Sequence, residues 1–162
     1  MNRNKECNLR RMILLALVVL VISGCTVKLI ASYDETTDHN VTALQRKVET
    51  FLTELETKEG LPECSYRNNS AFYTEAKVDL SAIKVRVDAI PGNDITAEQI
   101  ALLGSSLNDL AALHQLKDKN TKTAGMLQCL SSDEIKVLRF AFNASFTAIL
   151  KLELAKKRGD AN

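Results

Sequence analysis

The chain has 162 residues, of which 46% are hydrophobic, 5% are aromatic and 25% are charged, with 21 Lys and Arg against 20 Asp and Glu. This length suits one domain, and the apolar content excludes a chain that is disordered throughout. A net charge of +1 excludes the strongly basic surface of a dedicated nucleic-acid-binding protein, and six Gly and two Pro argue against a fold of many short strands. We therefore expect a single, mainly helical domain with no nucleic acid partner.

The first 24 residues have the organisation of a secretory signal helix. Four basic residues lie among the first eleven positions, and an uninterrupted apolar run fills residues 12–22. A basic segment followed by an apolar run of this length is typical of a signal peptide. The run would span roughly 16 Å as a helix, about half of the ~30 Å hydrocarbon core, so we do not expect it to serve as a final membrane anchor.

The apolar run ends in Ile22-Ser23-Gly24-Cys25. This sequence resembles the lipobox of bacterial lipoproteins, in which a branched aliphatic residue and two small residues precede the cysteine that is modified. The resemblance implies cleavage between Gly24 and Cys25, a diacylglyceryl thioether on Cys25 and acylation of the new amine by a chain such as palmitate. Thr26 follows the cysteine in place of the Asp that favours inner-membrane retention, which indicates the outer membrane, facing the periplasm. An uncleaved signal anchor with an unmodified Cys25 is the alternative.

After cleavage, residues 25–33 form a short membrane tether and residues 34–162 a helical domain. A first helix is predicted over residues 34–59 and a second over 70–90, because apolar residues recur at three-then-four spacing. Gly60 and Pro62 end the first helix, and residues 91–93 end the second. The predicted buried positions are Val41, Leu44, Val48, Phe51, Leu55, Phe72, Ala76, Leu80, Ile83, Val87 and Ile90, with Val78 and Val85 widening the second stripe.

Two capping boxes announce the remaining helices. Thr96 with Gln99, and Ser131 with Glu134, have the spacing in which each side chain can satisfy a free backbone N–H group. The apolar positions that follow are Ile100, Leu103, Leu107, Leu110 and Leu113 in the third helix, and Ile135, Leu138, Phe142, Phe146, Ile149 and Leu152 in the fourth, which closes on Lys156, Lys157, Arg158 and Gly159. Four amphipathic helices with short connections predict an all-α fold, an up-down-up-down four-helix bundle.

Two cysteines remain after processing. Cys7 leaves with the signal peptide and Cys25 carries lipid, so Cys64 and Cys129 are left in an oxidising compartment. In an up-down-up-down bundle their two connections lie at the same end, so we predict a Cys64–Cys129 disulfide, stabilising by about 4 kcal/mol on the chain-entropy model. A redox or nucleophilic cysteine is the alternative, but the sequence has no Cys-x-x-Cys pair.

Few residues suggest catalysis or metal binding. Asp34, Glu35, Asp38 and His39 have helical spacing that would suit a metal ion, but acidic residues also stabilise a helix N-terminus, and we favour this second interpretation. His114 follows the apolar stripe of the third helix and is expected to be partly buried. Since no phosphate-binding glycine loop, nucleophile elbow or paired metal motif appears, we expect no enzyme activity and no cofactor besides the covalent lipid.

An interaction surface is the best candidate for a functional site. Tyr66, Arg67 and Tyr73 flank Cys64 and have the composition of a protein contact. The alternative, which we favour, is that the tyrosines cover the end of the bundle around the disulfide. The polar loop 117–125 is a second candidate contact.

These features together predict a periplasm-facing lipoprotein that acts by binding, as an accessory or scaffold protein of the cell envelope. Its partners would be the membrane, through the lipid, and an envelope protein. An inhibitor or immunity-type protein, which blocks an enzyme with its end loops, is the alternative.

Overall fold

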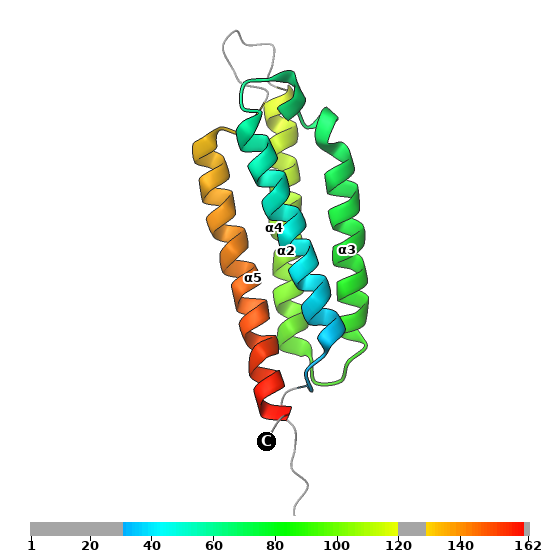
Figure 1. The fold of residues 1–162 in the computed structure, drawn as a ribbon. Coiled ribbons are helices and arrows are strands. Elements are labelled where there is room, and N and C mark those ends of the chain that lie inside the picture. The colour runs from blue at the N-terminus through cyan, green and yellow to red at the C-terminus, as the bar shows by residue number, and fades with distance from the viewer. Residues whose placement is uncertain (1–30, 120–128, 161–162) are drawn as a thin grey trace, which may run out of the picture.

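The computed structural model describes residues 31–119 and 129–160. Within these two ranges four long helices follow one another: α2 (Glu35–Thr57), α3 (Ser70–Asp88), α4 (Asp94–Lys119) and α5 (Ser132–Asp160), with two short 3₁₀ helices, η1 (Pro62–Cys64) and η2 (Arg67–Asn69), between α2 and α3. The helices pack as an up-down-up-down bundle in which α2 neighbours α3 and α5, and α4 neighbours the same two helices (Figure 1). The predicted fold is therefore confirmed, whereas the signal peptide, Cys25 and most of the tether lie outside the described residues.

One apolar stripe from each helix forms the core. Nearly every position predicted from periodicity is buried or packed against the core, and the burial of each large aliphatic or aromatic side chain contributes roughly 1.5–3 kcal/mol. The largest side chains with almost no exposed surface are Phe142, Phe146, Leu44, Leu52, Leu55, Ile83, Ile100, Leu103, Leu110, Leu130, Ile135 and Ile149.

The second stripe was predicted too wide. Val78 and Val85 are 63% and 69% exposed, because α3 buries only a narrow face against α2 and α4. Tyr73 occupies the core position that the prediction gave to Phe72, and Phe72 instead packs partly buried on Phe51, with the ring centres 3.7 Å apart.

The two predicted capping boxes have different outcomes. At α5, the backbone N–H of Ser131 donates to Glu134 Oε2 at 2.9 Å and the N–H of Glu134 donates to Ser131 Oγ at 3.3 Å, so this box is confirmed. At α4 the prediction was wrong, because the helix begins at Asp94 and Thr96 lies inside its first turn. The N–H of Ala97 donates to the carbonyl of Asn93 at 3.0 Å, which places the true cap at Asn93.

No helix among the described residues combines the length and the apolar content needed to cross a bilayer.

Candidate functional site

Cys64 and Cys129 meet at one end of the bundle. Cys64 lies in η1 and Cys129 shortly before α5, their Cα atoms are 5.4 Å apart, and both residues are buried. This Cα separation is typical of disulfides. The predicted juxtaposition of the two connections is therefore confirmed. We call this region the cysteine end, comprising Cys64, Tyr66, Tyr73, His114 and Cys129.

His114 joins two elements of the cysteine end. Its ring is fully buried, Nε2 lies 2.7 Å from the carbonyl oxygen of Cys64, and Nδ1 lies 2.7 Å from the hydroxyl of Tyr73. A carbonyl only accepts, so Nε2 carries the proton and Nδ1 accepts from Tyr73. Burial lowers the pKa of His114, which favours this neutral ring. The histidine is therefore buried more completely than predicted, as a bridge between η1 and α3.

The structure corrects one member of the predicted interaction surface. Tyr73 is only 9% exposed, and burial raises its pKa. Tyr66 is half-buried and stacks on Tyr73 with the ring centres 4.9 Å apart, whereas Arg67 is exposed. The favoured alternative therefore describes Tyr73: it closes the bundle around the cysteine pair, because its hydroxyl is required by His114.

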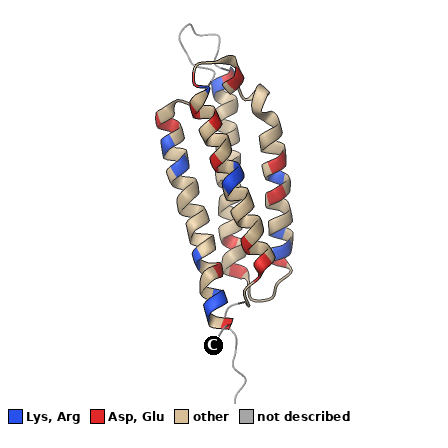
Figure 2. Cartoon of the chain, viewed as in Figure 1, with Lys and Arg blue, Asp and Glu red and all other residues tan. Residues whose placement is uncertain are grey.

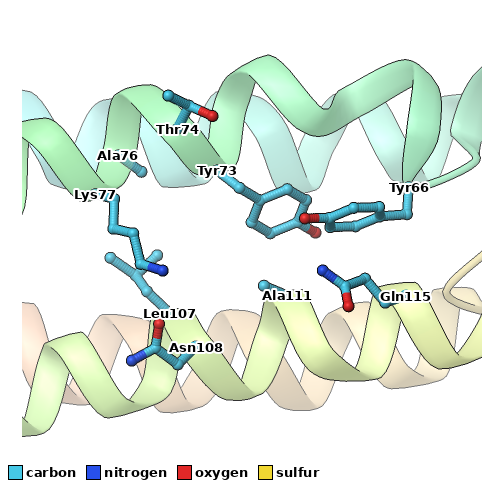
Figure 3. Close-up of a pocket in the computed structure, with 9 residues that line it drawn as sticks. All are labelled: Tyr66, Tyr73, Thr74, Ala76, Lys77, Leu107, Asn108, Ala111 and Gln115. Atoms are coloured by element: carbon cyan, nitrogen blue, oxygen red, sulfur yellow. The ribbon is translucent and has the colours of Figure 1, made fainter.

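A pocket opens beside the tyrosines, between α3 and α4. Its volume is about 170 Å³, and the stacked rings of Tyr66 and Tyr73 form one part of its wall (Figure 3). Lys77 extends into it from α3, and the amides of Asn108 and Gln115 from α4. Among the described residues, none of these three side chains has a hydrogen-bond or ion-pair partner. The pocket thus combines an aromatic wall with a free ammonium group and two free amides.

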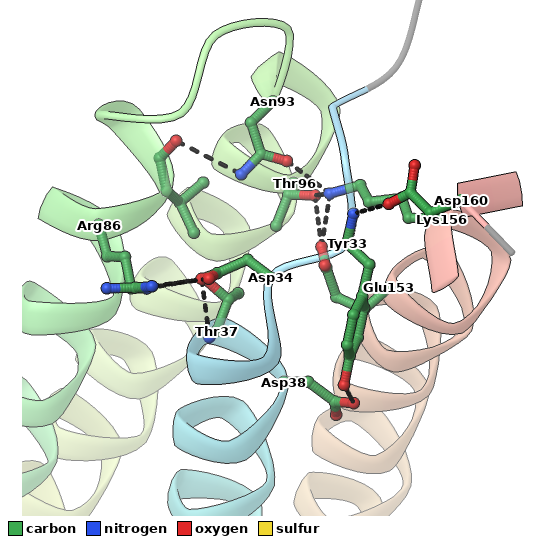
Figure 4. A network of polar contacts seen from close by, with 11 residues as sticks. Tyr33, Asp34, Thr37, Asp38, Arg86, Asn93, Thr96, Glu153, Lys156 and Asp160 are labelled. Carbon is green, nitrogen blue, oxygen red and sulfur yellow. Dashed lines mark hydrogen bonds and ion pairs between the residues drawn. The ribbon is translucent and has the colours of Figure 1, made fainter. Parts of the chain in front are cut away.

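A buried ionic network lies at the opposite end of the bundle (Figure 4). The ammonium group of Lys156 donates to Glu153 Oε1 at 2.6 Å, to Thr96 Oγ1 at 2.7 Å and to Asn93 Oδ1 at 2.5 Å, so all three of its protons have acceptors. Thr96 in turn donates to Glu153 Oε1 at 3.0 Å. The side chains of Lys156 and Glu153 are 2% and 1% exposed. The sequence interpretation missed this pair, although both residues continue the core spacing of Phe142, Phe146 and Ile149.

The described part of the predicted tether is attached to this same end. The N–H of Ala31 donates to the carbonyl of Gly92 at 3.1 Å, and the N–H of Tyr33 donates to Asp160 Oδ2 at 2.6 Å. The hydroxyl of Tyr33 donates to Asp38 at 2.8 Å, which raises the pKa of Tyr33 to about 12. We call this region the tether end, comprising residues 31–34 and the network around Lys156.

The acidic cluster at the start of α2 caps the N-terminus of this helix. Asp34 caps α2 by accepting from the N–H of Thr37 at 3.0 Å, and it also accepts from Arg86 at 2.6 and 2.7 Å. The hydrogen bonds from Arg86 are the largest cause of a pKa far below the usual range for Asp34. His39 lies 3.8 Å from Glu35 on the exposed surface. Over residues 31–119 and 129–160, no three His, Cys, Asp or Glu side chains are placed to hold a metal ion.

The polar loop that was the second candidate contact is described only at its start. Lys117 pairs with Glu134 at 2.7 Å and so joins the end of α4 to α5, while most of the loop lies outside the described residues.

No family model matches the chain, and no curated protein or solved structure is significantly similar to it.

Proposed function

We propose that this chain is a lipid-anchored lipoprotein that faces the periplasm, in the outer membrane, and acts by binding, as an accessory or scaffold protein of the cell envelope. The lipid on Cys25 would hold it at the bilayer, since each buried methylene contributes about 0.8 kcal/mol. Confinement to a surface raises the effective concentration of a binding module, so a modest affinity suffices.

The observation that carries this proposal is the separation of the tether end from the pocket. Residues 31–33 are bonded to one end of the bundle, whereas Tyr66 and Tyr73 belong to the other. From Tyr73 to the end of α3 at Asp88 the helix rises roughly 22 Å at 1.5 Å per residue. An anchor at the tether end would therefore present the pocket away from the bilayer, where an envelope protein can reach it.

The pocket itself supports recognition of an acidic group. Lys77 supplies the only formal charge among its lining residues, and Asn108 and Gln115 supply amide donors beside it. A carboxylate accepts from all three, and the ammonium group favours it over a neutral group. A volume of about 170 Å³ suits a side chain or a chain terminus better than a whole cofactor. We infer that an Asp, a Glu or a C-terminal carboxylate of the partner enters here.

The anchor is tested by replacing the predicted lipidated residue. Cys25→Ala should accumulate as an unprocessed precursor in membranes, because the lipobox cysteine is both the acceptor of the lipid and the first residue after cleavage. Intact mass of the wild-type protein should show the loss of residues 1–24 and the added acyl chains. Normal maturation of the variant would overturn the lipoprotein proposal.

The binding role is tested by crosslinking in the native envelope. A photoreactive residue at Arg67, beside the pocket and exposed, should capture a reproducible partner that mass spectrometry identifies. Lys77→Glu should reduce this capture about tenfold or more, because it places a second carboxylate against the bound one. Lys84→Glu, farther along α3 and outside the pocket, is the matched control. Absence of any reproducible partner would contradict the proposal, and capture of an enzyme that this chain inhibits would favour the inhibitor alternative.

A further inference from the structure

One lateral face of the bundle, between α4 and α5, is apolar and exposed. On α4, Ile95, Leu102 and Leu116 are 53%, 61% and 54% exposed. They are seven and fourteen residues apart, which places them on one side of the helix, and Asp109 and Leu113 fall on the same side. The pocket residues Asn108 and Gln115 lie on the other side of α4, toward α3. This stripe is therefore distinct from the pocket.

The neighbouring stripe on α5 consists mainly of small side chains. Val137 is 70% exposed, and four exposed alanines follow it at heptad-like spacing, Ala141, Ala144, Ala148 and Ala155. Between positions 135 and 152 the sequence of α5 has no acidic residue. Figure 2 shows this helix with a long uncharged stretch between its charged ends. A row of exposed alanines thus runs along α5 beside the larger exposed side chains of α4.

Two bonds fix the register of these helices. Thr96 on α4 bonds to Glu153 on α5 at 3.0 Å, and Lys117 on α4 pairs with Glu134 on α5 at 2.7 Å. The helices run antiparallel, so Ile95 lies level with Ala155, and Leu102 with Ala148. Ile95 and Leu102, two of the three large residues of the α4 stripe, therefore each have a small residue of the α5 stripe at the same height.

We propose that a second copy of this chain covers the α4–α5 face. A two-fold axis parallel to the helices would place α4 of each copy on α5 of the other without changing the height of any residue. Leu102 of one copy would then lie on Ala148 of the other, and Ile95 on Ala155. At these two heights a large side chain of α4 then faces a small side chain of α5 across the axis.

The charges bordering the face agree with this arrangement. Glu98 on α4 and Lys151 on α5 are both exposed, belong to no ion pair among the described residues, and lie at nearly the same height. The proposed axis brings Glu98 of each copy against Lys151 of the other. Asp109, the remaining carboxylate of the α4 stripe, would lie level with Ala141, whose small side chain leaves room for water around it.

The size of the face suits a stable contact. From Ile95 to Leu116 it extends about 32 Å, and two neighbouring helices are roughly 20 Å wide, which gives about 600 Å² in projection. Protruding side chains add to this, so each copy approaches the roughly 800 Å² of a standard interface. The same axis also directs both tether ends toward one bilayer. This last argument rests on the proposed anchor, whereas the packing and charge arguments do not.

The contact is tested by crosslinking two differently tagged full-length copies, one with Glu98→Cys and one with Lys151→Cys, co-expressed in native membranes. Mild oxidation should give a disulfide dimer carrying both tags. Lys84→Cys on α3, in place of Lys151→Cys, is the control and should give none. Equal yields from both pairs, or no mixed dimer, would overturn the proposal, as would capture of a different protein at position 98. Processing of Cys25 is scored in the same samples, so failure of anchoring and failure of pairing are read separately.

Charge reversal gives a second, quantitative test. Glu98→Lys and Lys151→Glu should each raise the dimer dissociation constant of the detergent-extracted protein about tenfold, because like charges then face each other. The double variant should restore the wild-type constant, since it exchanges the two charges. Sedimentation equilibrium measures all four proteins. A double variant no better than the single ones would contradict the pairing of these residues.

Discussion

The two ends of the bundle are held by different chemistry. The cysteine end is held by a cysteine pair placed to form a disulfide, by stacked aromatic rings and by a neutral histidine whose two ring nitrogens are both hydrogen-bonded. The tether end uses charge: a buried Lys156–Glu153 pair and the exposed Asp34–Arg86 pair. A buried charge destabilises the fold when its partner is removed. A disulfide is broken by reduction, and the hydrogen bonds of a neutral histidine are lost when mild acid protonates the ring. The ends should therefore fail under different conditions.

The largest effect is expected at the tether end. Glu153→Leu leaves the Lys156 ammonium buried without its counter-charge, which should lower the free energy of unfolding by about 3–5 kcal/mol in urea titrations. Adding Lys156→Met should recover most of this loss, because two apolar side chains replace the pair. A single variant as stable as the wild type would show that the network contributes little.

At the cysteine end, reduction should lower the free energy of unfolding by about 2–4 kcal/mol, because the bond would close a loop across 65 residues of sequence separation. Denaturation of the mature protein with and without a phosphine reductant measures it. The unreduced protein should take up no alkylating reagent at Cys64 or Cys129; labelling of both thiols would contradict the disulfide.

The same substitution distinguishes the two ends. Tyr73→Phe removes the donor to the buried Nδ1 of His114 and should lower the free energy of unfolding by about 1–3 kcal/mol. Tyr33→Phe removes a hydroxyl bonded to Asp38 at the solvent-facing tether end and should change stability little. Thermal unfolding of both variants makes the comparison, and equal losses would contradict it.

Acid should weaken the two ends in separate pH ranges. The pKa of His114 is lowered in the folded protein, so the unfolded chain takes up the proton first and stability decreases as the pH falls below about 6.5. His114→Gln should flatten this slope between pH 7.5 and 5.5. Urea midpoints of the wild type and the variant across this range test the prediction, and an unchanged slope would contradict it.

The carboxyl group of Asp34 at the tether end affects stability only at lower pH. Its folded pKa is also lowered, so its stabilisation is present at neutral pH and is lost only as the pH falls below about 3.9. Asp34→Asn should therefore change the slope there and leave the range between pH 7.5 and 5.5 as in the wild type.

Periodicity and local spacing predicted the helices, their order and the meeting of Cys64 with Cys129. Ser131 and Glu134 form a capping box as expected, because all of its atoms lie within four residues. Thr96 has the same spacing to Gln99, but its hydroxyl donates to Glu153, 57 residues away. A rule based on local spacing does not predict this long-range hydrogen bond.

The residues of the candidate site were harder to predict, because they too depend on contacts between helices that are distant in the sequence. Lys156 was placed only in the basic last turn of the fourth helix, and Tyr73 was named as a candidate contact residue or, in the favoured interpretation, as a cover for the end of the bundle, although both residues are buried. Their positions at core spacing, with Phe146 and Ile149 in one helix and Ala76 and Ile83 in the other, would have indicated burial. The free polar groups around Lys77 come from two helices and depend on how closely these pack, which the sequence does not specify.

The hydrogen bond from Ala31 to Gly92 limits the distance that the proposed anchor allows between the bilayer and the pocket. If Cys25 is the anchor, only six steps of chain connect the lipid to the bundle, a reach of at most about 20 Å. Added to the roughly 22 Å rise of α3, this keeps the pocket within about 40 Å of the bilayer surface. Lengthening this segment with Gly and Ser would extend that working radius without altering the bundle.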